Sequence, residues 1–102
     1  MNKEFNCPVE ATISLIGGKY KSVILFHLMG KTLRYSELHK KIPKATDKML
    51  AQQLRELEKD GLIKRTVYPV VPPKTEYNLT EFGESLSPIL NAMCNWGESY
   101  LN

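Results

Sequence analysis

Four long polar side chains recur at helical spacing between residues 46 and 61, and their chemistry suits hydrogen bonding to a polyanion. At about 100° per residue, one side of a helix would present Lys48, Gln52, Arg55 and Lys59. Lysine and arginine bind phosphate oxygens, and a glutamine amide can pair with a base edge. A helix whose polar side merely faces solvent can carry the same residues, so the interpretation depends on the neighbouring elements.

The same stretch contains the signals that would fold and orient this helix. Leu50, Leu54 and Leu57 form an apolar stripe opposite the polar face, as in a helix packed on a core. Thr46 stands at the N-cap position, Asp47 follows in the first turn, and Gly61 can end the helix. We therefore expect an amphipathic helix whose outer side is basic.

A second, shorter helix should precede it across a tight turn. Ser36 offers an N-cap, Leu38 and Ile42 are apolar, and Pro43 cannot continue a helix. Lys44 and Ala45 are then the residues left before Thr46. Two helices joined so closely predict a helix-turn-helix over about residues 36–60.

A β-hairpin is expected directly after this unit, over about residues 62–79. Residues 62–68 and 75–79 are rich in strand formers, and a proline-rich tip separates them. The second helix of a helix-turn-helix, the recognition helix, enters the major groove of DNA, and a hairpin that follows it is called a wing. Basic residues on a wing suit the DNA phosphates beside that groove. A short strand at residues 32–35 adds Arg34. The candidate DNA-binding residues are Arg34, Lys44, Thr46, Lys48, Gln52, Arg55, Lys64, Arg65 and Lys74.

Apolar helices should flank this unit. Residues 8–16 and 19–29 have helical spacing, and the second is apolar on most sides, so it is the expected central core helix. His27 within it reads as a core histidine. A last helix over about residues 80–101, capped by Thr80, contains Pro88, which should kink it or start a second segment capped by Ser87. Its apolar stripe is long, and burial against a second subunit is the favoured interpretation over packing on its own domain.

Length and charge limit the class of protein. The 102 residues, 42% of them hydrophobic, suit one domain spanning the chain, residues 1–102. Residues 31–74 hold 11 Lys and Arg against five Asp and Glu, whereas residues 75–102 hold four Glu and no Lys or Arg. One surface facing a polyanion and another facing protein would produce this asymmetry.

Several function classes find no support in the sequence. No HExxH, glycine-rich phosphate loop or paired-carboxylate motif is present, so neither an enzyme nor a cofactor is expected. Cys7 and Cys94 form no CxxC pair, and no protein-bound metal is expected. No apolar run is long enough to span a membrane, and the N-terminus has no apolar signal region, so a cytoplasmic location is expected.

Several segments together resemble the HxlR family of bacterial winged-helix transcription regulators, which is related to the MarR proteins. They are CPVEATISLIGGKYKSVILFHL, RYSEL, MLAQQLRELEKDGLIKR, VYPVVPPKTEYNLTEFGESL and NWG, in this order from Cys7 to about Leu101. Tyr20 stands where many relatives have tryptophan, and it should keep the packing role. The resemblance implies a homodimer built from the first and last helices, with both recognition helices in successive major grooves. The candidate interface residues are Val9, Ile13, Ile89, Met93, Trp96 and Tyr100.

The resemblance also implies that Cys7 can sense electrophiles or oxidants, as the N-terminal cysteine does in some relatives. Cys7 immediately precedes Pro8, so its sulfur should lie at the start of the first helix, where the dipole favours a thiolate. Lys3 could add positive charge there. The alternative is that Cys7 is a small apolar anchor. Cys94 is expected to pack, although it could be the oxidation partner of Cys7.

The expected fold is therefore mainly α with a small β-hairpin, an α+β winged helix-turn-helix with additional terminal dimerisation helices. The expected function is sequence-specific binding of double-stranded DNA at an inverted repeat, as a homodimeric repressor or autoregulator. A small oxidant or electrophile could be its effector. Two alternatives are a repressor that senses metal through Cys7, Cys94, His27 and His39, and a winged helix that binds protein without DNA.

Overall fold

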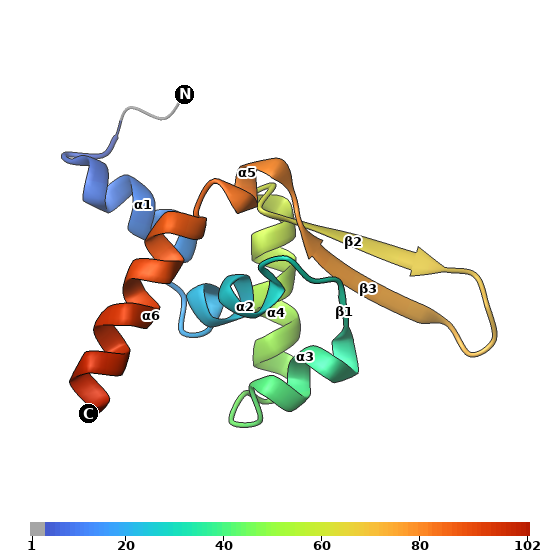
Figure 1. Ribbon diagram of the computed structural model, residues 1–102. Coiled ribbons are helices and arrows are strands. Elements are labelled where there is room, and N and C mark those ends of the chain that lie inside the picture. The colour runs from blue at the N-terminus through green and yellow to red at the C-terminus, as the bar shows by residue number, and fades with distance from the viewer. Residues whose placement is uncertain (1–3) are drawn as a thin grey trace.

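Helices dominate the chain, and one small sheet extends from them (Figure 1). The computed structural model describes residues 4–102. Its longest dimension is 47 Å, and the two terminal helices lie at the end opposite the hairpin tip. The elements in chain order are α1 (Pro8–Ile16), α2 (Lys21–Leu28), β1 (Leu33–Arg34), α3 (Tyr35–Lys41), α4 (Asp47–Lys59), β2 (Ile63–Tyr68), β3 (Lys74–Leu79), α5 (Glu81–Glu84) and α6 (Ser87–Leu101).

Helix α4 forms as the sequence pattern predicts. The Thr46 hydroxyl oxygen accepts a hydrogen bond from the backbone N–H of Met49 at 3.1 Å, which caps the helix. Leu50, Leu54 and Leu57 are buried in the core. Gly61 ends this segment with φ at 78°, a left-handed conformation that a side chain would strain. The chain turns there directly into the hairpin.

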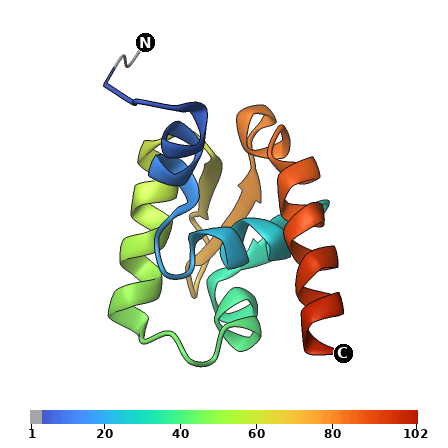
Figure 2. The same ribbon diagram turned by 90° about the vertical axis from the view of Figure 1, so that its left-hand side faces the viewer.

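Helix α2 occupies the middle of the molecule, as expected of the core helix. Ile24, Leu25 and Leu28 are buried on it, and it packs against both α4 and α6. Figure 2 shows α4 and α6 on opposite sides with α2 between them. The helix starts at Lys21, two residues later than expected, because the chain is still turning after α1 at Tyr20.

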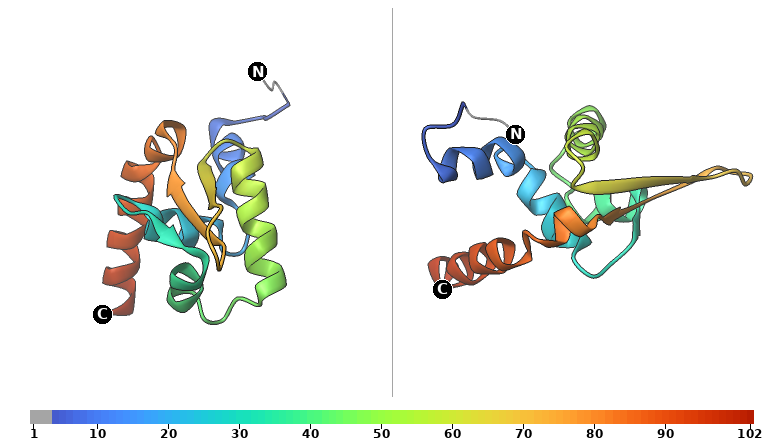
Figure 3. Two further views of the ribbon diagram at one scale, coloured as in Figure 1. Left: turned by 90° about the vertical axis from the view of Figure 1, so that its right-hand side faces the viewer. Right: turned by 90° about the horizontal axis from the view of Figure 1, so that it is seen from above.

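The hairpin of β2 and β3 is part of a three-stranded antiparallel sheet with the order β1-β3-β2. The register pairs Ile63 with Leu79, and both side chains lie in the core. The strands then continue beyond the helices, so the hairpin projects from the molecule as a wing (Figure 3). Pairing of β1 with β3 ties the wing to the chain segment that starts α3.

Two expected N-caps are wrong. Ser36 does not cap α3; Arg34 is the N-cap, and its backbone N–H donates to the Glu37 carboxylate at 2.8 Å. Pairing of β1 with β3 holds Arg34 extended up to the first helical residue, which decides where the helix begins. Ser87 lies inside α6, whose N-cap is Leu86. Neither helix starts at the serine that its capping preference would select.

The expected C-terminal helix is divided into two helices. Thr80 caps α5 as expected, because its hydroxyl oxygen accepts from the Gly83 N–H at 3.0 Å. Pro88 stands in the first turn of α6, where a missing N–H costs nothing. Of the two possibilities for Pro88, it therefore starts a second segment. Leu86 and Leu90 are buried, and they attach this part of the chain to the core.

Candidate nucleic-acid interface

The outer side of α4 presents the polar residues expected of a recognition helix. Lys48, Gln52 and Arg55 are all exposed, at helical spacing and opposite the buried leucines. Lys44 is exposed in the turn before this helix. Thr46 caps the helix, and its hydroxyl hydrogen can still be donated to a phosphate. These side chains form one surface that a DNA major groove can accept.

A hydrogen-bonded cluster fixes the turn between α3 and α4. The Tyr35 hydroxyl donates to Asp47 Oδ1 at 2.8 Å, and His39 Nδ1 lies 3.1 Å from the same oxygen. His39 Nε2 donates to the backbone carbonyl of Ala45 at 2.9 Å. Residues of α3 therefore hold both the turn and the first residue of α4. This cluster positions the N-terminal half of the recognition helix.

The Tyr35 hydroxyl stays protonated at neutral pH. Burial first, then the hydrogen bond to Asp47, raises the pKa of Tyr35 to about 12. The ring of Tyr35 also contacts the His39 ring edge-on, with centroids 5.9 Å apart. The sequence interpretation missed this cluster. The spacing of four between the two rings was the available signal, since such residues lie on one helix face.

Arg55 lies beside the wing and shares a recess with it. The recess has a volume of about 380 Å³ and lies between α4 and the β-strands. Arg65 and Tyr77, which are paired across β2 and β3, form its other wall. Burial raises the pKa of Tyr77, and the nearby Arg65 opposes this rise. The Glu58 side chain borders the same recess. The two guanidinium groups can together hold a phosphate of the DNA backbone.

The other basic residues of the wing lie on the opposite face of the sheet. Successive strand residues point to opposite faces, so Lys64 faces away from Arg65. In the strand register, Lys64 lies opposite Asn78 and Arg34 lies opposite Glu76, two residues from Asn78 on β3. Lys74 is two residues further along β3, so all three cations lie on that second face. The structure thus divides the expected wing contacts between two faces, with Arg65 nearer to Arg55.

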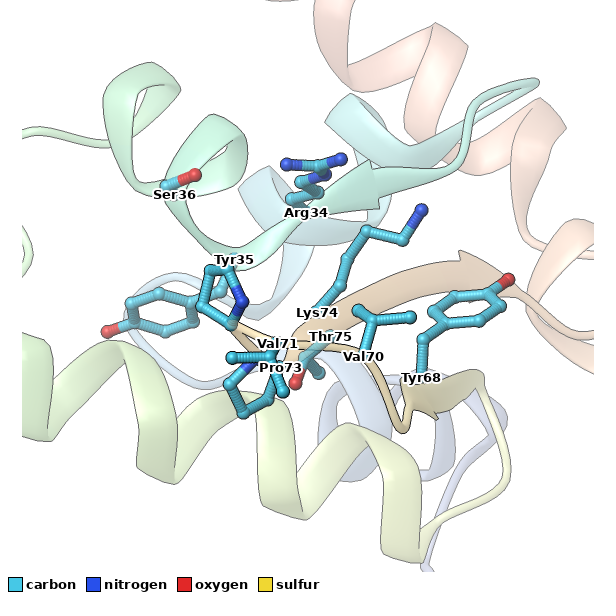
Figure 4. A pocket seen from close by; sticks show the side chains of 10 residues that line it. Arg34, Tyr35, Ser36, Tyr68, Val70, Val71, Pro73, Lys74 and Thr75 are labelled. Carbon is cyan, nitrogen blue, oxygen red and sulfur yellow. The ribbon is translucent and has the colours of Figure 1, made fainter.

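A hollow of about 570 Å³ lies on this second face, between the wing and the start of α3 (Figure 4). Lys74 Nζ lies 3.6 Å from the Glu76 carboxylate and 4.6 Å from the centre of the Tyr68 ring. A hydrogen bond to Glu76 raises the pKa of Tyr68. Lys74 is therefore held against the wing and is less free to reach DNA than an extended surface lysine.

Contacts from the N-terminal end of α2 hold α4 on the side away from the wing. Lys21 Nζ lies 2.7 Å from Glu56 Oε1, and the Tyr20 backbone N–H donates to Gln53 Oε1 at 3.0 Å. Tyr20 itself packs against the core, as expected. Sequence reasoning did not identify Lys21, Gln53 or Glu56. Their types are ordinary for a helix surface, and only the fold brings them together.

The two cysteines occupy different environments. Cys7 is exposed and is the N-cap residue of α1, and its backbone carbonyl accepts from the Glu10 N–H at 3.0 Å. The Glu10 carboxylate in turn accepts from the Asn6 backbone N–H at 2.7 Å. Lys3, expected to add charge near Cys7, lies outside the described residues. Cys94 is half-buried and borders a small apolar groove between α2 and α6.

Large apolar side chains are exposed on α1 and α6. Trp96 and Tyr100 are 70% and 75% exposed, and their rings stack with centroids 5.4 Å apart. A surface of this kind, far from the basic helix face, is typical of a protein–protein contact. All the expected interface residues are exposed, namely Val9, Ile13, Ile89, Met93, Trp96 and Tyr100.

Comparison with known proteins decides the family. The HxlR-like helix-turn-helix family matches residues 15–102. The chain belongs to this family. It is a DNA-binding transcription regulator with a winged helix-turn-helix, as the sequence analysis expected.

Individual relatives agree with this chain over nearly its whole length. The HTH-type transcriptional regulator YtcD of Bacillus subtilis is 55% identical over 100 residues, which is 98% of this chain and 79% of YtcD. The redox regulator HypR in its oxidised form is 50% identical with a TM-score of 0.87, covering 91% of this chain and 96% of HypR. Its reduced form gives 48% identity and a TM-score of 0.88, covering 94% and 95%.

The histidines of this HxlR-like protein are structural. His27 is half-buried, as expected, and burial first, then Lys41 and Lys31, lowers its pKa, so it is neutral near pH 7. Within residues 4–102, no group of three or more His, Cys, Asp and Glu side chains is placed to hold a metal ion. In the same part of the chain, no helix has the length and apolar character needed to cross a membrane.

Proposed function

We propose that this protein is a homodimeric, cytoplasmic repressor that binds an inverted-repeat operator and responds to oxidants or electrophiles through Cys7. The observation that supports it most is the separation of two surfaces. The exposed polar face of α4 lies beside the wing, and the exposed apolar face of α1 and α6 lies at the other end. One surface suits DNA and the other suits a second subunit.

Two subunits joined by these helices would present two recognition helices related by a two-fold axis. Such a dimer requires half-sites about 34 Å apart, one turn of DNA, or a multiple of that distance. The exposed Val9 and Ile13 on α1 and Trp96 on α6 support this arrangement. Sedimentation at micromolar concentration tests it, because a stable monomer that binds one half-site tightly would contradict the proposal.

Gln52 and Arg55 are the residues proposed to contact bases. A glutamine amide can pair with adenine through one acceptor and one donor, and arginine can pair with guanine or hold a phosphate. The recess shared with Arg65 favours the phosphate role for Arg55. Gln52 is exposed and is not among the residues that line this recess, which favours base contact. The remaining candidates position the protein on the DNA backbone.

We expect Gln52→Ala to weaken operator binding by about 1–3 kcal/mol and to change binding to random duplex little. The reason is that a base contact is lost only where the matching base is present. Mobility shift with both duplexes at several salt concentrations measures this. Arg65→Ala is the control, since loss of a phosphate contact should weaken both complexes alike and reduce the salt slope. Equal losses on both duplexes for Gln52→Ala would assign it to the backbone.

The same salt series separates DNA binding from the protein-adaptor alternative. A DNA regulator loses affinity steeply with salt, since binding releases counterions from the duplex. A winged helix that binds only protein would show no specific shift. The basic residues exposed on α4 and in the turn before it favour the first result.

The proposed redox response starts at Cys7. The thiol is exposed at the start of α1, where a small oxidant or electrophile can reach it. Similarity to HypR, a redox regulator solved in oxidised and reduced forms, supports this role. An adduct or an intersubunit disulfide on α1 would change how the subunits meet.

A physical route leads from α1 to the recognition helix. The segment after α1 is bonded to α4 twice, by Tyr20 to Gln53 and by Lys21 to Glu56. Movement of α1 would therefore move or release α4. A small rotation of one subunit would move its recognition helix out of its half-site, because the two recognition helices must fit both major grooves at the same time.

We expect diamide to lower the operator affinity of the wild type at least tenfold, and Cys7→Ser to abolish this response. Diamide takes two electrons and two protons from a pair of thiols, which become a disulfide, and is itself reduced to the hydrazine. Cys94→Ser is the matched control variant, because it keeps Cys7 and removes the other, half-buried thiol. Mobility shift and non-reducing electrophoresis measure the outcome. If wild type and Cys7→Ser respond alike, Cys7 is structural.

A further inference from the structure

A chain of three side chains connects α2 with the exposed face of α4. Gln52 Nε2 donates to Glu56 Oε2 at 3.2 Å. The other oxygen of the same carboxylate, Glu56 Oε1, lies 2.7 Å from Lys21 Nζ. Each carboxylate oxygen of Glu56 therefore has a different partner: the largely buried Lys21 for Oε1 and the exposed Gln52 for Oε2.

Lys21 is an unusually fixed partner for a surface carboxylate. Its side chain is only 10% exposed, so the ammonium group cannot move freely through solvent. Gly18 lies against its aliphatic part, since a Cβ on Gly18 would be 2.9 Å from Lys21 Cδ. The hydrogen bond from Lys21, then that from Gln52, lowers the pKa of Glu56. Glu56 is therefore ionised and held in place at neutral pH.

An ionised carboxylate can only accept hydrogen bonds, and this settles the orientation of the Gln52 amide. The NH₂ group must face Glu56, because the reverse orientation would place two oxygens against each other. Gln52 Oε1 then points away from Glu56. One N–H of Gln52 is used in this bond, and the second remains beside Oε1. The exposed edge of Gln52 thus offers one acceptor and one donor.

We propose that Glu56, anchored by Lys21, is a positioning residue that orients the Gln52 amide and so sets its preference for adenine. Adenine presents the N6–H₂ donor and the N7 acceptor in the major groove, which match this acceptor and donor pair. Guanine presents two acceptors there and does not match. The inference rests on the proposed base contact of Gln52, and it adds the residue that determines which base is chosen.

The first test uses duplexes selected by the wild-type protein from a randomised pool. The base pair that Gln52 contacts is then identified as the position at which the Gln52→Ala variant no longer prefers one base. We then compare the double variant Lys21→Met/Glu56→Gln, which keeps the net charge and replaces a buried ammonium by an apolar group. A neutral amide at position 56 accepts or donates equally well, so the Gln52 amide is free to turn. The adenine preference at this base pair should fall roughly tenfold.

A matched control separates this effect from a general disturbance. Lys19→Met/Glu58→Gln removes one lysine just before α2 and one glutamate from α4. Both residues are exposed, and Glu58 borders the recess on the wing side of α4. This variant should keep the adenine preference of the wild type. Circular dichroism and thermal unfolding of each variant show whether the fold is retained.

A charge exchange, Lys21→Glu/Glu56→Lys, gives a readout that a merely structural ion pair would not affect. The introduced ammonium at position 56 can only donate, so Gln52 Oε1 should turn toward it and the NH₂ group should face the DNA. The preference at the Gln52 base pair should then move from adenine to guanine, whose N7 and O6 are acceptors. This result needs no loss of stability, and it distinguishes orientation from packing.

The outcomes separate the inference from the proposed function. If Gln52→Ala leaves every base preference unchanged, Gln52 does not read a base, and both proposals fall. If Gln52→Ala removes the adenine preference but both Glu56 variants keep it, the base contact stands and the positioning role of Glu56 is wrong. Loss of the preference in the neutral pair and its movement to guanine in the exchanged pair would establish the role.

Discussion

Replacing Gly83 with alanine will destabilise this protein by about 3 kcal/mol or more, because the new methyl group has no space. A Cβ at Gly83 would lie 2.1 Å from the backbone oxygen of Leu62. That oxygen is fixed, since it accepts a hydrogen bond from the Thr80 N–H at 3.1 Å. Either α5 or the start of the wing must move, and the Thr80 cap would be lost with it. Chemical denaturation followed by circular dichroism measures the change in the free energy of unfolding.

Gly97→Ala provides the control for this prediction. Gly97 lies inside α6, and apart from its chain neighbours and the adjoining helix backbone no atom of the described residues lies within 4 Å of the position that its Cβ would take. Alanine is the better helix former by about 1 kcal/mol, so this variant should be unchanged or more stable. Similar unfolding curves for the two variants would show that the chain can move away from Gly83 at little cost. The close contact with Leu62 would then have no energetic importance.

In the proposed homodimer, Trp96→Ala should convert the dimer to monomer at micromolar concentration and with it remove tight operator binding. Large aromatic side chains at the centre of an interface typically contribute about 2–4 kcal/mol, which is roughly 30- to 1000-fold in the dissociation constant. Trp96 is 70% exposed in the single chain and stacks on Tyr100, so both rings are available to a partner. A monomer holds one recognition helix, and it therefore loses the second half-site.

Sedimentation equilibrium and mobility shift with one or two half-sites measure this effect. Val71→Ala is the control for dimerisation, since Val71 is the most exposed of the large apolar residues in the described chain but lies on the wing. It should leave the dimer intact. A Trp96→Ala protein that remains dimeric and binds the full operator normally would move the subunit contact to another surface. Unchanged thermal unfolding at low concentration would confirm that the single chain is still folded.

The sequence by itself determined the elements whose formation depends on near neighbours. The leucines of α4, the Thr46 and Thr80 caps and the stop at Gly61 all act within a few residues. Helical spacing and caps are local properties, so the helix-turn-helix and the hairpin could be predicted. The basic face of α4 followed from the same periodicity, because residues opposite a buried stripe must face solvent.

Local signals failed where a distant segment decided the outcome. Ser36 and Ser87 are good capping residues, yet α3 begins at the end of a strand paired with β3, and α6 begins where Leu86 enters the core. The division of Lys64 and Arg65 between two faces of the wing also depends on strand register. A cap contributes about 1 kcal/mol, which is less than burial of a core side chain or pairing of a strand.

Only the tertiary structure brought Lys21 and Tyr20 against Glu56 and Gln53. Each pair is separated by more than 30 positions, and each residue alone is an ordinary polar residue of a helical protein. The same holds for the cluster that joins Tyr35 and His39 to Asp47 across the turn. Periodicity reports which side of a helix faces the core, but not which polar group lies opposite. Hydrogen bonds act over about 3 Å, so the partner of a polar side chain is known only when the packing of the helices is known.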